Sequence, residues 1–70
     1  MKFKAFLIPD VGDAKITRLF NNAVNCQASA RADARLMFKQ RPEVNSIEVV
    51  VCENNEAMEN MHEFFTREAL

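Results

Sequence analysis

The sequence is poor in the residues that interrupt regular structure, with one glycine and two prolines in 70 residues, and it contains neither tryptophan nor tyrosine. With 49% hydrophobic and 27% charged side chains, it is too apolar for a disordered or low-complexity chain. A multidomain enzyme is excluded because separate domains usually need about 100 residues each. The composition therefore predicts one small globular domain covering residues 1–70.

Long apolar stretches and cysteine motifs are also missing. The apolar stretch at residues 5–9 is far shorter than a signal-peptide core or a membrane span, so we expect a cytoplasmic protein with no membrane partner. Cys26 and Cys52 show no CxxC or paired-histidine spacing, so neither a zinc site nor a redox motif is indicated. We expect both thiols to be reduced and buried, and we expect no metal or other cofactor.

Charges of opposite sign are separated along the chain. Residues 1–42 carry eight Lys or Arg and three Asp, a balance of +5, whereas residues 43–70 carry seven Glu and one Arg, a balance of −6. The spatial consequence depends on how the two parts pack.

The first part of the chain is predicted to form a hairpin. Residues 2–8 are an apolar run typical of a strand, and the turn residues that follow include the only glycine. Residues 15–25 are predicted as a second strand. The spacing of Ile16, Leu19 and Phe20 also fits an amphipathic helix with Asp13 as its N-cap, which is the alternative.

A helix is predicted to start at Ser29, whose hydroxyl can cap the first turn, and to end near Gln40 before Pro42. Its apolar stripe consists of Ala30, Ala34, Met37 and Phe38. Residues 46–52 alternate as in a strand with one fully apolar face.

A final helix is predicted from Asn54 or Asn55, either of which can serve as the N-cap, to the C-terminus. Its apolar stripe consists of Ala57, Met58, Met61, Phe64 and Phe65. The predicted fold class is therefore α+β, with a small three-stranded sheet in ββαβα order and two helices packed on one face.

Two groups of residues are candidate binding surfaces. The first is basic, could follow a phosphate backbone, and consists of Lys2, Lys4, Arg18, Arg31, Arg35 and Lys39. The second lies on the predicted C-terminal helix and consists of Met58, Met61 and Phe65.

Catalytic signals are weak. Glu59 and His62 have the spacing of half a dinuclear metal site, but the chain holds one copy only, and a solvent-facing histidine is the better interpretation. No nucleophile motif accompanies them, so we expect no enzymatic activity.

The leading functional hypothesis is a non-enzymatic protein-interaction module, homodimeric, that binds and occludes or bridges a macromolecular partner. By analogy of plan alone, it would be an accessory or regulatory protein of a bacterium or phage. The alternative is a protein that binds single-stranded or duplex nucleic acid through the face formed by Arg31, Arg35 and Lys39 and the basic strands.

Overall fold

Two long strands form the centre of the protein. The structure, a computed structural model, describes residues 2–69. Strands β1 (Phe3–Pro9) and β3 (Ser46–Glu53) pair antiparallel along their whole length, from Phe3 opposite Glu53 to Pro9 opposite Ile47. The first was predicted over residues 2–8 from a compact apolar run and the second over residues 46–52 from alternating side chains, and both are confirmed.

Three short strands complete a five-stranded antiparallel sheet. Strand β2 (Lys15–Ile16) pairs with β1, while β4 (Glu56–Ala57) and β5 (Glu63–Thr66) pair with successive parts of β3. Two short 3-10 helices, η1 (Glu59–Met61) and η2 (Arg67–Ala69), flank β5. The α+β class is confirmed, but the expected three-stranded sheet is wrong.

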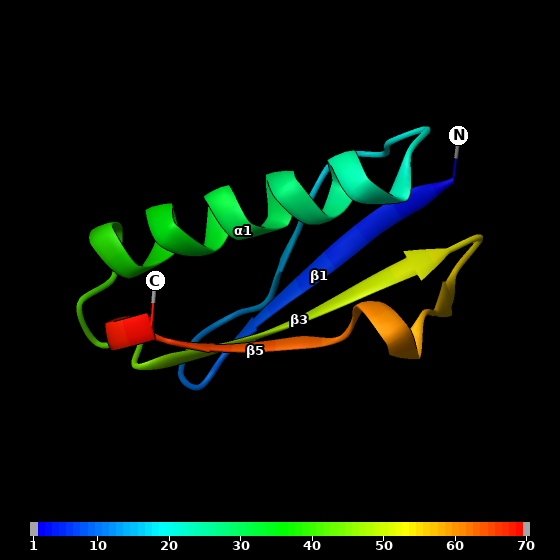
Figure 1. The fold of residues 1–70 in the computed structure, drawn as a ribbon. Helices are drawn as coiled ribbons and strands as arrows, with labels where there is room; N and C mark the ends of the chain where they lie inside the picture. The colour runs from blue at the N-terminus through cyan, green and yellow to red at the C-terminus, as the bar shows by residue number, and fades with distance from the viewer. Residues whose placement is uncertain (1, 70) are drawn as a thin grey trace.

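One α-helix, α1 (Ala23–Gln40), lies across one face of the sheet (Figure 1). Its predicted stripe of Ala30, Ala34, Met37 and Phe38 is buried, as are the expected strand residues Ile47, Val49 and Val51. These side chains form a core layer between helix and sheet together with Ala5, Leu7, Cys26 and Val44. Within residues 2–69 no helix is both long and apolar enough to span a membrane.

The predicted second strand over residues 15–25 is mostly wrong. Only Lys15–Ile16 forms a strand, followed by a single bridge between Phe3 and Phe20. Helix α1 begins at Ala23, well before Ser29, and is capped by Asn22, whose Oδ1 atom accepts a hydrogen bond from the backbone N–H of Asn25 at 3.1 Å. The hairpin reversal between the first two strands is nevertheless present.

The predicted C-terminal helix is also wrong. Asn54 and Asn55 have φ angles of 52° and 71°, and two successive positive φ values form a tight hairpin turn between β3 and β4. The chain therefore returns along β3 instead of entering a helix. Asparagine tolerates this left-handed conformation better than most residues, so the same two residues fit a turn as well as a cap.

The loop between β1 and β2 is held against the end of α1. Gly12 has a φ of 91°, which L side chains rarely adopt. The Arg41 guanidinium covers this loop and donates to the carbonyl oxygen of Val11 at 3.2 Å. This contact holds the loop of the first hairpin against the end of α1.

Candidate binding surface on the open sheet face

Among residues 2–69, α1 lies on one face of the sheet and no helix lies over the middle of the other face (Figure 1). That second face carries exposed apolar side chains. Successive side chains of a strand point to opposite faces, so burying Ala5 and Leu7 under α1 turns their neighbours outward. Ile8 is 40% exposed, Ile16 is 56% exposed and Phe64 is 68% exposed. We call this surface the open face; its apolar members are Phe6, Ile8, Ile16, Val50 and Phe64.

Strand register arranges the open face in rows. Phe6 of β1 lies opposite Ile16 of β2 on one side and Val50 of β3 on the other, which gives a central apolar row. One row along, Glu48 lies between Ile8 and Phe64. Cross-strand neighbours of this kind lie about 5 Å apart, so each row is continuous.

The two ends of the open face carry opposite charges. At one end Lys4 lies opposite Cys52, with its ammonium nitrogen 5.4 Å from the centroid of the Phe6 ring. At the other end the Oε2 atom of Glu48 lies 2.6 Å from Nε2 of His62. The apolar centre is therefore bracketed by a cation and by a carboxylate.

The basic residues of α1 lie at the flank of the helix that overlooks β5. Arg31 forms a two-bond ion pair with Glu63, with nitrogen to oxygen distances of 3.1 and 2.6 Å. Hydrogen bonding to this carboxylate, and its charge, raise the pKa of Arg31. Arg35 and Lys39 are exposed and form no ion pair with any side chain of residues 2–69.

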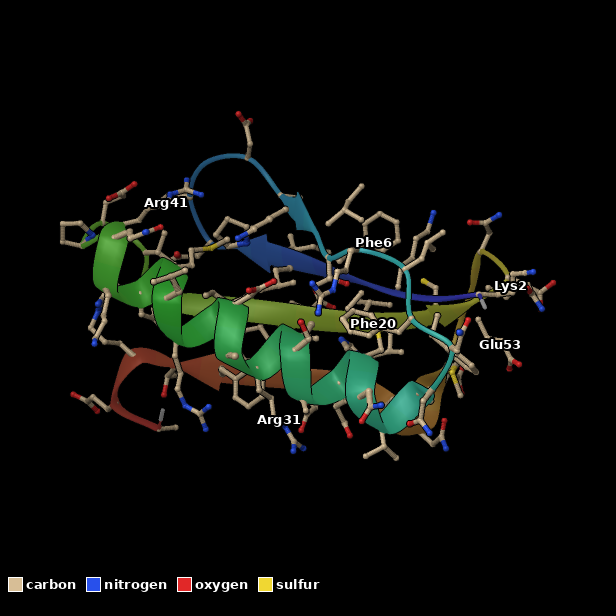
Figure 2. All side chains as sticks on the ribbon, turned by 90° about the horizontal axis from the view of Figure 1, so that it is seen from above. Lys2, Phe6, Phe20, Arg31, Arg41 and Glu53 are labelled. Atoms are coloured by element: carbon tan, nitrogen blue, oxygen red, sulfur yellow. The ribbon has the colours of Figure 1, made fainter. Side chains whose placement is uncertain are left out.

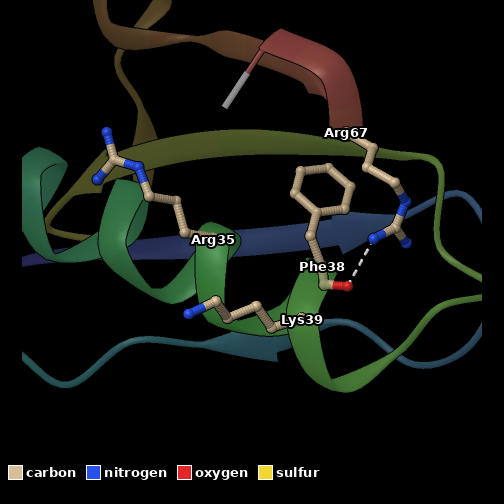
Figure 3. Close-up of a pocket in the computed structure, with 4 residues that line it drawn as sticks. All are labelled: Arg35, Phe38, Lys39 and Arg67. Carbon is tan, nitrogen blue, oxygen red and sulfur yellow. Dashed lines mark hydrogen bonds between the residues drawn. The ribbon is translucent and has the colours of Figure 1, made fainter.

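A shallow cleft of about 270 Å³ separates this flank from the C-terminal segment and is lined by Arg35, Phe38, Lys39 and Arg67 (Figure 3). The Arg67 guanidinium lies 5.1 Å from the centroid of the Phe38 ring. It also donates a hydrogen bond of 2.6 Å to the carbonyl oxygen of Phe38. Arg67 is thus already occupied, whereas Arg35 and Lys39 line the cleft with exposed side chains whose charged ends extend away from Phe38 and Arg67.

The six predicted basic residues do not gather on one surface. Lys4 is on the open face, and with Lys2 it borders a hollow beside the β3–β4 turn. Arg18 lies beyond β2, 5.2 Å from the centroid of the Phe20 ring. The three on α1 form a separate row, of which Figure 2 shows Arg31 at the side of the helix away from Phe6.

The predicted apolar binding residues also lie apart from the open face. Met58, Met61 and Phe65 are partly buried and pack against the core. Phe64, next to Phe65, points the other way and is the exposed member of the pair. Sequence reasoning missed the open face, although the alternation within residues 3–9 was the available signal.

The polar residues considered for chemistry are dispersed. Among residues 2–69, no group of three or more His, Cys, Asp or Glu side chains could hold a metal ion. Cys26 and Cys52 are free and buried, as predicted. Burial raises the pKa of the Cys26 thiol, a hydrogen bond with Thr17 lowers it, and the neighbouring Cys52 raises it further.

Comparison with known proteins adds no constraint on these assignments. No known protein family, curated protein or solved structure matches the chain.

Proposed function

We propose that this protein is a non-enzymatic protein-interaction module that forms a homodimer through its open face. The supporting observation is that α1 covers one face of the sheet only, which leaves Ile8, Ile16 and Phe64 exposed on the other. Contiguous apolar surface of this kind marks interaction sites on small proteins. A second sheet packed on this face would complete a two-sided core.

The size of the open face fits a reversible dimer. Strands β1 and β3 have seven and eight residues, and the shorter β2 and β5 flank them. At about 3.4 Å per residue and about 4.8 Å between strands, the four span at most about 19 by 24 Å. Stable interfaces bury about 800 Å² per partner. Side chains project from the sheet and add to its flat area, so the accessible surface of this face approaches the size of a small stable interface. The whole described surface measures 4460 Å², so such a contact covers a substantial fraction of it. We therefore expect dimerisation to depend on concentration.

The end charges select one orientation of the two sheets. A two-fold axis in the interface plane, perpendicular to the strands and through the Phe6 and Val50 row, places Lys4 of each chain over Ile8 of the other, one strand away from Glu48. An axis parallel to the strands would place like charges together, which is repulsive. Charge complementarity therefore favours the perpendicular axis.

In this dimer both α1 helices lie on the outside and point away from the interface. The two Arg35 and Lys39 pairs are then displayed on opposite faces, which suits a module that bridges two copies of a partner. A nucleic-acid function is less favoured, because Lys4 and Arg18 lie far from this row in the fold and Glu63 already neutralises Arg31.

The test is native mass measured by sedimentation equilibrium over a range of chain concentrations. Phe64→Asp should shift the protein to monomer, because it places a charge in the apolar contact. Val24→Asp is the matched control, since Val24 on α1 is equally exposed at 68% and lies outside the open face. Both variants should keep the far-UV circular dichroism of the parent.

Charge reversal tests the orientation. Lys4→Glu and Glu48→Lys should each weaken the dimer by about tenfold, because the contact contains two such ion pairs of up to about 1 kcal/mol each. The double variant should recover most of the loss. A wild-type protein that remains monomeric at every concentration refutes the proposal. Steeply salt-dependent oligonucleotide binding that Arg35→Glu abolishes would support the nucleic-acid alternative instead.

A further inference from the structure

A second site, which shares only Phe64 with the open face, lies at the outer edge of β5. The backbone N–H of Arg67 donates to the carbonyl oxygen of Asn45 at 3.0 Å, in register with the β3–β5 ladder. In an antiparallel ladder, every second residue of a strand exchanges hydrogen bonds with the same neighbour. Since Arg67 bonds to the β3 side, Phe65 and Glu63, two and four residues earlier, also bond to β3. The backbone groups of Phe64 and Thr66 therefore point away from β3.

Most of these outward groups have no partner within the described chain. Phe64 and Thr66 are exposed, and among residues 2–69 both groups of Phe64 and the N–H of Thr66 have no other backbone partner, whereas the carbonyl of Thr66 begins the first turn of η2. The opposite side of the sheet differs, because residues 14–20 follow β1 and supply bonds such as Thr17 N–H to the carbonyl oxygen of Ala5 at 2.9 Å. A strand edge with free donors and acceptors is a template for an added strand.

The side chains beside this edge determine what kind of strand fits. On the helix side, Arg35 and Lys39 line the cleft, and their charged ends extend away from Phe38 and Arg67 (Figure 3). Neither forms an ion pair among the described side chains. On the open-face side, Phe64 offers an exposed ring. Side chains of an added strand alternate between these two sides. We propose that the β5 edge binds an extended acidic peptide, with acidic residues toward α1 and apolar residues beside Phe64.

A second copy of this chain is a poorer occupant of the same edge. Pairing β5 with β5 of another copy, about a two-fold axis perpendicular to the sheet, keeps both α1 helices on one face. The two Arg35 side chains would then point toward one another, and Glu63 could not separate them because it is bonded to Arg31. An acidic partner strand removes this repulsion.

The probe is an end-blocked peptide of about seven alternating Glu and Val residues, which overhangs the four residues of β5. Binding is followed by NMR on labelled protein. We expect the Phe64 and Thr66 amides to shift most. A peptide of alternating Lys and Val should bind at least about tenfold more weakly. A version of the acidic peptide is methylated on every second backbone nitrogen, so that the edge that would pair with β5 has no N–H donors. This peptide should no longer bind.

Protein variants separate charge from backbone recognition. Arg35→Glu should weaken the acidic peptide by about tenfold and leave the native mass unchanged, since the edge is distinct from the open face. Arg18→Glu makes the same charge change away from β5 and should have no effect. Thr66→Pro removes an outward N–H without touching the β3 ladder, and Thr66→Ala is its control.

Three results would overturn the peptide site. These are equal binding of the N-methylated and parent peptides, equal binding of the Lys and Glu peptides, and equal weakening by Arg18→Glu and Arg35→Glu. If Thr66→Pro loses the circular dichroism of the parent, the N-methylated peptide still decides the question of backbone recognition.

Discussion

Replacing Arg67 with Ala should destabilise the fold more than any other change of a charged side chain described above. Its guanidinium closes the junction between the end of α1 and the start of β3. Nη1 donates to the carbonyl oxygen of Phe38, and Nη2 donates to the carbonyl oxygens of Arg41, Pro42 and Val44. The last carbonyls of a helix lack intrahelical partners, so this side chain supplies a donor for the carbonyl of Phe38 and a second donor for that of Arg41, which also accepts from the backbone N–H of Val44.

The expected loss follows from these contacts. The two guanidinium nitrogens count as two effective charged hydrogen bonds, each worth about 1.5 kcal/mol in a half-buried site. Contact with the Phe38 ring adds roughly 0.5 kcal/mol, whereas water recovers part of the loss at the exposed carbonyls. Arg67→Ala should therefore cost about 2 to 3 kcal/mol, equivalent to a fall of about 10 to 20 °C in Tm for a domain of this size.

The assay is urea and thermal unfolding followed by far-UV circular dichroism, because the chain has no tryptophan or tyrosine for fluorescence. Arg67→Lys should lose about half as much, since it keeps the charge near the helix end but not the forked donor. Arg35→Ala is the control and should change stability by less than about 0.5 kcal/mol. A loss below about 0.5 kcal/mol for Arg67→Ala, or full recovery with Lys, would refute the capping argument.

Three further outcomes are expected. Gly12→Ala should cost about 1 to 2 kcal/mol in urea unfolding, because the φ of 91° is unfavourable for any side chain with a Cβ. Cys26 and Cys52 should react slowly with a thiol reagent in the folded state, because both are buried. Burial also raises the pKa of Cys26, so the unfolded state ionises first as pH rises through the ordinary thiol range, and the free energy of unfolding should fall there. Phe65→Asp should unfold the protein at temperatures where Phe64→Asp remains folded, which thermal scans would show, since only Phe65 packs against the core.

The C-terminal third shows why an apolar pattern can favour the wrong element. Met58 and Met61 are three residues apart, and side chains at this spacing also share one side of a 3-10 helix, so their burial does not require an α-helix. Phe64 and Phe65 decide between the two interpretations. A helix would place both on one stripe, whereas a strand directs one inward and the other outward, as observed.

The start of α1 was hidden by a competition between two caps. Ser29 followed by alanines favours a helix start, and nothing local marks Asn22 as the stronger cap. The choice was made by tertiary packing, because starting at Ala23 brings Cys26 into the core beside Ala30. The stripe from Ala30 to Phe38 was predictable because it depends only on helical periodicity.

The candidate site was less predictable than the fold because both of its surfaces arise from pairing between distant segments. The sequence separates charge into a basic first part and an acidic second part, but β1 lies against β3 and α1 overlooks β5, so the two parts interleave. The charge of Arg31 is neutralised by Glu63, while Lys4 and Glu48 lie at opposite ends of the open face. Two local features remain among the described residues. One is the apolar open face with opposite charges at its two ends, and the other is the basic flank of α1 beside the outer edge of β5. Each fits a different partner, so a loss of dimer without loss of peptide binding in Ile16→Asp, which lies on the open face at the edge away from β5, and the reverse in Arg35→Glu, would show that the two surfaces act independently.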